Sequence, residues 1–146
     1  LDYYQSILDQ YPAAKDVKVI QNKTYDLLNE SSAALVTSGT ATLETALFGV
    51  PEVVCYKGNP ISYQIAKRLV NIKYISLVNL IVDRPLVKEL IQKELNTPNL
   101  VKEVKLLFDE THRKTIQEGY QELRSNLGNS GASQRTAQLI VKYLTR

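Results

Sequence analysis

The segment AALVTSGTATLETALF, residues 33–48, contains the change of pattern that decides the fold. Its first four residues form a continuous apolar run, which is typical of a strand covered on both faces of a parallel sheet. Its last six residues have helical spacing, and Gly49 directly after them is a common helix stop. Small and hydroxylated residues, 38–40, lie between the two patterns. The segment therefore predicts a strand, a tight turn and a helix in succession.

The predicted turn has the properties of an anion site. The first N–H groups of a helix have no partner within the helix, and they lie at the positive end of the helix dipole. A phosphate is a suitable ligand for such a position. Glu44, one turn into the helix, would then reach sugar hydroxyls beside the phosphate. We therefore expect a nucleotide-sugar site.

Composition indicates one ordinary globular domain over residues 1–146. The chain is 44% hydrophobic and 23% charged, with a formal net charge of +3, which gives no reason to expect disorder. Because this charge is mild and basic residues are mostly mixed with acids, we do not expect nucleic acid as a partner. Only between residues 57 and 73 do basic residues stand without acids, which leaves a local anionic partner open.

The single cysteine, Cys55, excludes an internal disulfide and a multi-cysteine metal site, and its apolar neighbours predict a buried, inert thiol. No apolar run reaches the roughly 18 residues of a membrane span, and no signal peptide opens the chain. The expected location is cytoplasmic. The chain contains no methionine, so we expect it to be cut from a longer protein.

Strand and helix patterns alternate along the chain and then give way to helices. We expect strands at residues 17–20, 33–36, 52–56 and 74–82, and helices at 1–11, from Thr24, 43–48, 61–70, from Pro85, from Thr97, at 116–127 and after a Ser133 cap. This order predicts an α/β fold, a Rossmann-like doubly wound parallel sheet, with residues 97–146 as a helical tail of the same domain. Ligands of such sheets bind at the carboxyl ends of the strands.

Several separate motifs closely resemble those of lipid-A-disaccharide synthase, in that family's order: residues 37–44, 51–57, 63–69, 74–81, 89–92 and 131–133. The resemblance implies the carboxyl-terminal half of an inverting glycosyltransferase of the two-Rossmann-domain (GT-B) type, which works without metal or cofactor. Such an enzyme transfers 2,3-diacylglucosamine from UDP to 2,3-diacylglucosamine 1-phosphate with a β-1,6 linkage, in lipid A biosynthesis. It acts peripherally at the cytoplasmic face of the inner membrane.

The same resemblance implies that this half binds the UDP-diacylglucosamine donor. The lipid acceptor and the general base would belong to a missing N-terminal acceptor domain, so no catalytic residue is expected here and the fragment alone should not turn over. The turn would bind the diphosphate and stabilise the leaving group, and Glu44 would bind the ribose. The substrate-binding residues of this turn and helix would be Ser38, Gly39, Thr40, Ala41, Thr42 and Glu44. A plain capping turn and an acid that complements the helix dipole are the alternatives.

Further donor contacts are implied outside the turn, at Asn22, Tyr56, Lys57, Asn79, Glu89 and Gln92. Asn22 lies in a polar loop, and Tyr56 and Lys57 end a predicted strand, so solvated loops explain them nearly as well. Asn79 interrupts an apolar run, where an amide must find partners, so it either pins a turn or binds a ligand. Glu89 and Gln92, three residues apart, would share one helical face, and a plain solvated face is the alternative to donor recognition.

A cationic surface is the last candidate feature. It would form part of the surface that meets acidic phospholipid or lipid phosphate, and a solvated cationic face is the plainer interpretation. Its residues would be Tyr63, Lys67, Arg68, Lys57 and Lys73.

Three other positions bear on the chemistry of the site. His112 has no second histidine or cysteine beside it and is expected at the surface, without a metal. Val78 and Asp83 depart from the proline and glycine that the resemblance implies there.

Three alternatives remain open. The first two are enzymes of the same architecture: a peptidoglycan-lipid glycosyltransferase and a UDP-sugar 2-epimerase. An epimerase would need acidic and histidine residues for proton abstraction, which His112 is poorly placed to supply. The third is a non-catalytic nucleotide-binding module.

Overall fold

The computed structural model describes residues 2–59, 63, 73–128 and 131–145. They form two units, residues 1–32 and 33–146. The predicted helix at 61–70 lies outside the described residues except for Tyr63. Whether residues 1–146 act as a single donor-binding domain stays a prediction.

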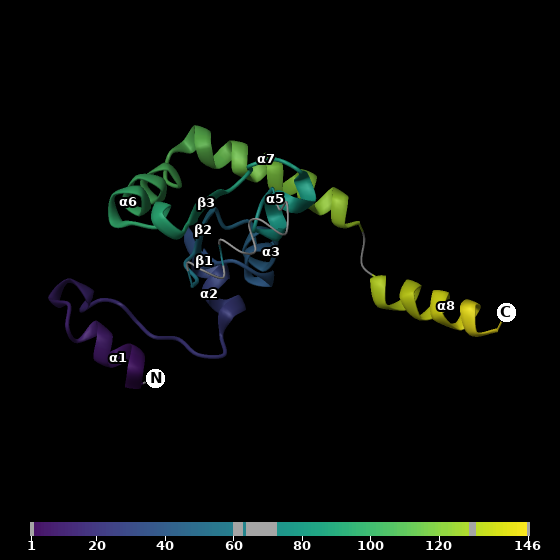
Figure 1. Ribbon diagram of the computed structural model, residues 1–146, viewed down its shortest axis with the longest axis horizontal. Helices are drawn as coiled ribbons and strands as arrows, with labels where there is room; N and C mark the ends of the chain where they lie inside the picture. The colour runs from purple at the N-terminus through teal and green to yellow at the C-terminus, as the bar shows by residue number, and fades with distance from the viewer. Residues whose placement is uncertain (1, 60–62, 64–72, 129–130, 146) are drawn as a thin grey trace. The chain divides into compact units, whose positions relative to one another are not determined.

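The first unit consists of short helices joined by extended chain (Figure 1). It contains α1 (Asp2–Leu8), the 3-10 turn η1 (Pro12–Ala14) and α2 (Thr24–Glu30). The predicted strand at 17–20 is wrong. These residues form neither a helix nor a strand, none of them takes part in the described sheet, and Val17 is 56% exposed. A β-branched run becomes a strand only where a neighbouring strand pairs with it.

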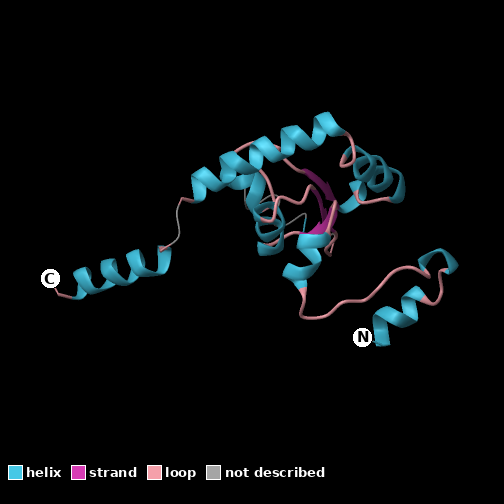
Figure 2. Cartoon of the chain, turned by 180° about the vertical axis from the view of Figure 1, so that it is seen from behind, coloured by secondary structure: helices cyan, strands magenta, loops and turns pink. Residues whose placement is uncertain are grey.

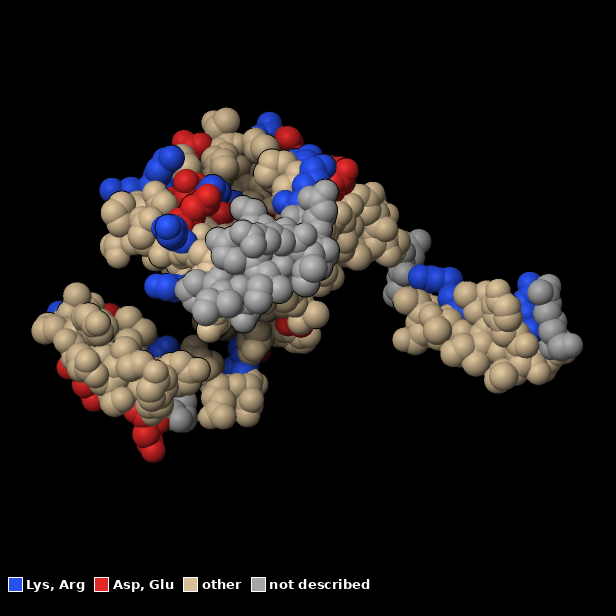
Figure 3. All heavy atoms as spheres, in the orientation of Figure 1, with Lys and Arg blue, Asp and Glu red and all other residues tan. Residues whose placement is uncertain are grey.

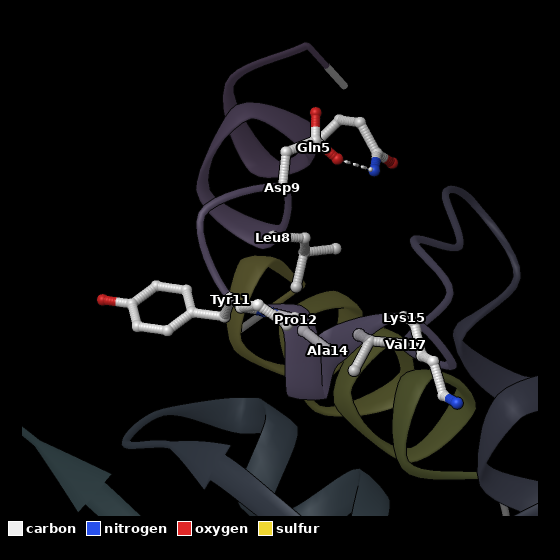
Figure 4. A pocket seen from close by; sticks show the side chains of 8 residues that line it. All are labelled: Gln5, Leu8, Asp9, Tyr11, Pro12, Ala14, Lys15 and Val17. Carbon is white, nitrogen blue, oxygen red and sulfur yellow. Dashed lines mark hydrogen bonds between the residues drawn. The ribbon is translucent and has the colours of Figure 1, made fainter.

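A hollow of about 270 Å³ lies within this first unit. Figure 4 shows that its lining combines side chains of α1, such as Gln5 and Leu8, with those of the residues after this helix, such as Asp9 and Pro12. The only hydrogen bond drawn there joins the Gln5 amide to the Asp9 carboxylate, at 2.9 Å. None of the predicted site residues lines this hollow.

The second unit is built on a parallel sheet. Its strands are β1 (Ala34–Thr37), β2 (Glu52–Tyr56) and β3 (Lys88–Ile91), in the order β1-β2-β3. Thr37 pairs with Cys55, and Tyr56 pairs with Ile91, so the three carboxyl ends meet at one edge of the sheet. The predicted α/β, Rossmann-like fold is therefore confirmed.

Helices cover both sides of this sheet. Figures 1 and 2 place α3 (Thr40–Leu47) and α5 (Leu77–Val82) on one side and α6 (Thr97–Leu106) on the other. The turn η2 (Gln92–Glu94) follows β3, and α7 (Glu110–Leu127) packs on α5 and α3. The fully buried centre includes Val53, Val54, Val78, Leu90, Ile116 and Leu123.

The last helix, α8 (Ala132–Leu144), buries none of its residues. Its exposed apolar side chains are Leu139, Ile140, Val141, Tyr143 and Leu144. Among the helices that the structure describes, none combines the length and the apolar character that a bilayer crossing requires.

Two predicted elements have the opposite type in the structure. Residues 74–82 were expected as a strand, but Leu77–Val82 is a helix, capped by the Ser76 hydroxyl, which accepts from the Asn79 N–H at 3.2 Å. A helix was expected from Pro85, but Lys88–Ile91 is a strand paired with β2. In both places tertiary packing overrides local propensity.

The predicted helix caps also shift by one or two residues. Thr24 and Thr97 are first helical residues rather than caps, and Ser133 is the second. The cap positions are Lys23, Asn96 and Gly131. Of these, the Asn96 side chain caps α6 by accepting from the Asn99 N–H at 3.1 Å.

Gly119 permits the close packing of α7 against the segment that precedes β3. A Cβ at this position would lie 2.2 Å from Leu86 Cδ1 and 2.9 Å from Leu86 Cγ, and Leu86 is itself buried. We expect Gly119→Ala to lower the free energy of unfolding by about 1–3 kcal/mol, because overpacking outweighs the better helix propensity of alanine. Urea denaturation measures this loss. Gln121→Ala on the exposed side of α7 is the control, and a Gly119→Ala chain as stable as the control would contradict the packing.

Candidate functional site

The turn between β1 and α3 depends on the backbone of Gly39. Its φ of 136° and ψ of −161° lie in a region that only glycine adopts readily. The Gly39 carbonyl accepts from the Thr42 hydroxyl at 2.8 Å and from the Thr42 N–H at 3.2 Å. Thr42 is fully buried, so its hydroxyl holds the turn from inside.

Unpaired donors lie at the start of α3. Among the described residues, no backbone or side-chain acceptor binds the N–H groups of Gly39, Thr40 or Ala41. Gly39 and Thr40 are exposed, and Ala41 is half-buried. These donors and the positive end of the helix dipole form a surface suited to an anion.

Ser38, the first residue after β1, is already engaged within the chain. Its hydroxyl donates to the Ile75 carbonyl at 2.9 Å. The family resemblance implied that Ser38 takes part in binding the diphosphate, but its hydroxyl could donate to a phosphate only if its bond to Ile75 were broken. In the structure Ser38 ties the turn to the segment that leads into α5.

Glu44 lies one turn into α3 and is half-buried. Its carboxylate has no hydrogen bond or ion pair among the described residues, so its acceptor capacity is unused there. A half-buried carboxylate beside unpaired N–H donors is suited to a ligand that carries both hydroxyls and a phosphate.

The neighbouring strands bring further predicted residues to the same edge of the sheet. Tyr56 ends β2 and Lys57 follows it, both exposed, while Gln92 follows β3. Gln92 has a φ of 52°, and its Nε2 is buried without an acceptor among the described residues. A buried donor without a partner is suited to an acceptor atom of a ligand. Asn22 belongs to the first unit, and its role stays a prediction.

Asn79 and Glu89 come together in one hydrogen-bonded cluster. The Asn79 amide, which is 1% exposed, donates to the Val87 carbonyl and to Glu89 Oε1, and it accepts from the Val87 N–H, all at 2.9 Å. The expectation that Glu89 and Gln92 share a helical face is wrong, because Glu89 is in β3 and Gln92 lies beyond its end.

Sequence reasoning missed the burial of Glu52. This side chain is 0% exposed, and both carboxyl oxygens lack a partner among the described residues. Burial raises the pKa of Glu52 from 4.5 to about 9, so the carboxyl is neutral at pH 7. Burial, and then the nearby Glu52 carboxyl, also raise the pKa of Tyr120. One available signal was an acid within the apolar run from Val50 to Tyr56.

The expected cationic surface is described only in part, because Lys67 and Arg68 lie outside the described residues. Lys73 pairs with Asp83 at 2.7 Å, and this hydrogen bond raises the pKa of Lys73. Asp83 has a φ of 49°, which explains why a glycine would suit this position. On the face shown in Figure 3, positive and negative side chains are mixed over the described surface.

Cys55 was expected to be buried and His112 to lie at the surface, but both residues are half-buried. Partial burial raises the pKa of the Cys55 thiol, which keeps it protonated and unreactive. No cluster of histidine, cysteine and acidic side chains suited to a metal occurs in the described part of the chain.

An α/β sheet of the Rossmann-like kind, with unpaired N–H donors in the turn after its first strand, is an arrangement typical of nucleotide-binding domains. The family model for lipid-A-disaccharide synthetase matches residues 2–143, and the chain belongs to that family.

Relatives named lipid-A-disaccharide synthase support this assignment. The chain is 39% identical over 131 residues to that of Syntrophus aciditrophicus, covering 89% of this chain and 34% of the relative. It is 35% identical over 130 residues to that of Geobacter sulfurreducens, covering 88% and 34%. For Acidobacterium capsulatum the identity is 41% over 107 residues, covering 73% and 27%. The chain thus spans about a third of the length of the curated relatives it matches.

Proposed function

We propose that this chain is the donor-binding part of a lipid-A-disaccharide synthase, a hexosyltransferase of lipid A biosynthesis. In this proposal the chain binds UDP-2,3-diacylglucosamine, and the sugar is transferred with inversion to 2,3-diacylglucosamine 1-phosphate. The observation that carries the proposal is the set of unpaired N–H groups at Gly39, Thr40 and Ala41, in a chain of this family.

The turn after β1 would stabilise the leaving UDP. Negative charge builds on the β-phosphate as the glycosidic bond breaks, and preoriented N–H donors stabilise that charge. Thr40 is an exposed residue, and in this proposal its hydroxyl adds a further hydrogen bond. Leaving-group stabilisation of this kind uses no metal, in accord with the family resemblance.

The other site residues would recognise the rest of the donor. The unpaired Glu44 carboxylate would accept from the ribose hydroxyls, and Gln92 Nε2 would donate to a ligand oxygen. Tyr56 and Lys57 would face the sugar or phosphate, and Asn22 would approach the uracil or ribose. Asn79 and Glu89 would support this edge through the cluster that joins α5 to β3.

The general base and the lipid acceptor site would belong to the part of the enzyme outside this chain. We further propose peripheral contact with the inner membrane on its cytoplasmic side, where Lys57 and the cationic segment after it would meet acidic phospholipid. Vesicle sedimentation with and without anionic lipid tests this contact.

Isothermal titration calorimetry with UDP and 2′-deoxy-UDP tests the donor site and the role of Glu44 together. The unaltered chain should bind UDP about tenfold more tightly than 2′-deoxy-UDP, because a ribose hydroxyl donates to the carboxylate. Glu44→Ala should weaken UDP binding and remove the preference, whereas Glu118→Ala, an exposed acid on α7, should change neither.

Two results would count against the proposal. No heat with UDP at millimolar concentration, in a chain shown to be folded by circular dichroism, would refute the donor site. An unchanged preference for UDP in Glu44→Ala would refute the ribose role alone.

A further inference from the structure

Glu89 binds the segment that leads into α5 through several donors at once. Its Oε1 accepts from the Ser76 hydroxyl at 2.8 Å, from the Ser76 N–H at 3.0 Å and from Asn79 Nδ2 at 2.9 Å. The Ile75 N–H lies 3.2 Å from Oε1 and 3.1 Å from Oε2. Hydrogen bonds to an ionised acceptor are stronger than those between neutral groups, so the carboxylate holds this segment firmly.

The segment held by Glu89 also holds the turn after β1. The Ile75 carbonyl and the Ser76 N–H belong to the same planar peptide group. Glu89 Oε1 accepts from the nitrogen side of this group, and the Ser38 hydroxyl donates to its oxygen side at 2.9 Å. One rigid peptide group therefore connects the two side chains, and each bond polarises the other.

The sheet register separates Glu89 from the turn. Glu89 pairs with Val54 of β2, and Val54 pairs with Val36 of β1. Glu89 is thus two strands away from the strand that precedes the turn, and the described hydrogen bonds reach Ser38 only through the Ile75–Ser76 peptide group. Its Oε1 is already surrounded by donors, which leaves this oxygen little capacity for a ligand.

We propose that Glu89 is a positioning residue of the nucleotide site: it fixes the Ile75–Ser76 peptide group, which holds Ser38 and thereby sets the conformation of the turn at residues 38–42. This inference rests on the proposed function and extends it, since it assigns Glu89 to the support of the phosphate-binding turn rather than to contact with the donor. The conformation that would be lost without Glu89 is the one that aligns the unpaired N–H groups.

A double-mutant cycle between Glu89 and Ser38, read by calorimetry with UDP, tests the proposal. Glu89→Gln keeps the size of the side chain but replaces one acceptor oxygen with a donor that faces donors. Glu89→Gln and Ser38→Ala should each weaken UDP binding about tenfold. The double variant should bind within about twofold of the weaker single variant, because both changes break the same connection.

The double-mutant cycle has one control variant and two results that would overturn the proposal. Glu94→Gln, an exposed acid paired with Lys88 at 3.5 Å, should bind UDP as the unaltered chain does. An additive loss of about a hundredfold in the double variant would overturn the proposal, because Glu89 would then act on the ligand independently of Ser38. Unchanged UDP binding in Glu89→Gln would overturn it as well.

Hydrogen exchange of the ligand-free chain provides a readout that does not depend on UDP. The Thr42 N–H, bonded to the Gly39 carbonyl, reports on the turn, and the Phe48 N–H, bonded to the Glu44 carbonyl, reports on the far end of α3. Glu89→Gln should speed exchange at Thr42 about tenfold without changing Phe48. It should have no such effect when Ser38 is already alanine.

The exchange experiment separates failure of this inference from failure of the proposed function. If the unaltered chain does not bind UDP, the proposed function fails, and exchange at Thr42 still decides the role of Glu89. Equal Thr42 protection in Glu89→Gln and the unaltered chain would overturn the inference. Should Glu89→Gln fail to fold, Glu89→Asp, which withdraws the carboxylate by one methylene, should show the same local change at Thr42, and its absence would overturn the inference.

Discussion

Replacing Glu52 with methionine is expected to stabilise the second unit by on the order of 3 kcal/mol at pH 7. The folded chain keeps the Glu52 carboxyl protonated up to about pH 9, whereas the unfolded chain releases that proton near pH 4.5. The folded state therefore binds more protons between these values, so the free energy of unfolding falls as pH rises, by about 1.4 kcal/mol per unit. Methionine has a similar length and no oxygen that needs a partner in this buried place.

Urea unfolding at pH 5, 7 and 8.5 measures this effect. The advantage of Glu52→Met over the unaltered chain should be smallest at pH 5 and grow steadily toward pH 8.5. Glu118→Met, at an exposed position of α7, should show no such trend. A stability difference that stays constant with pH, or a Glu52→Met chain that is less stable throughout, would contradict the neutral buried carboxyl.

Replacing Gly39 with alanine is expected to weaken UDP binding at least tenfold. A Cβ at Gly39 would meet no atom within 4 Å, so space is not the obstacle. The obstacle is the backbone, because a φ of 136° is strained for any residue with a side chain, at a cost of about 1–3 kcal/mol. The turn would relieve that strain by moving, and the N–H groups after it would lose their alignment.

Gly49 offers a matched control at the other end of the same helix. It too has a positive φ, 76°, and open space around its Cα, so Gly49→Ala is also strained. Its cost should appear in the free energy of unfolding, by about 1 kcal/mol, but not in UDP affinity. Calorimetry on both variants separates the two effects. Equal UDP affinity in Gly39→Ala and Gly49→Ala would contradict the role of the turn.

Local sequence was sufficient to predict the existence of β1 and β2. Residues 33–48 form a strand, a turn and a helix in the expected order, but β1 (Ala34–Thr37) lies one residue later than the expected 33–36, and α3 begins at Thr40 rather than Leu43. The bounds of β2 are those predicted. In these segments the local sequence pattern and the tertiary packing favour the same secondary structure, so the pattern alone predicts the correct element. The positive φ of Gly39 follows from the same small-residue turn.

The segment between α5 and β3 could not be assigned from local pattern. The run LVNLIV at 77–82 is rich in strand formers, and the sequence after Pro85 has helical periodicity. Short apolar runs do not distinguish a buried strand from a buried helix. The deciding contacts are non-local: Glu89 of β3 accepts from the N–H groups of Ile75 and Ser76, directly before α5, and β3 pairs with β2. Only Ser76, three residues before Asn79, was a local signal for the helix.

In the candidate site, too, local features could be predicted from sequence and long-range contacts could not. The turn after β1, with Ser38 and Gly39, could be predicted from sequence because a change from strand to helix pattern is a local feature, and its binding of an anion stays a prediction. The bond from Ser38 to Ile75 spans 37 residues, and that from Tyr120 to the Val50 carbonyl spans 70. Contacts between residues so far apart cannot be predicted from the pattern of a short stretch of sequence.

The most direct test of the central claim, that residues 38–42 bind the diphosphate of a UDP-sugar, is a titration of the 15N-labelled chain with UDP, followed by amide chemical shifts. The largest changes should occur at Gly39, Thr40 and Ala41, whose N–H groups lack acceptors among the described residues. Saturable changes centred there would support the claim. No change at millimolar UDP, or changes confined to residues outside this turn, would contradict it.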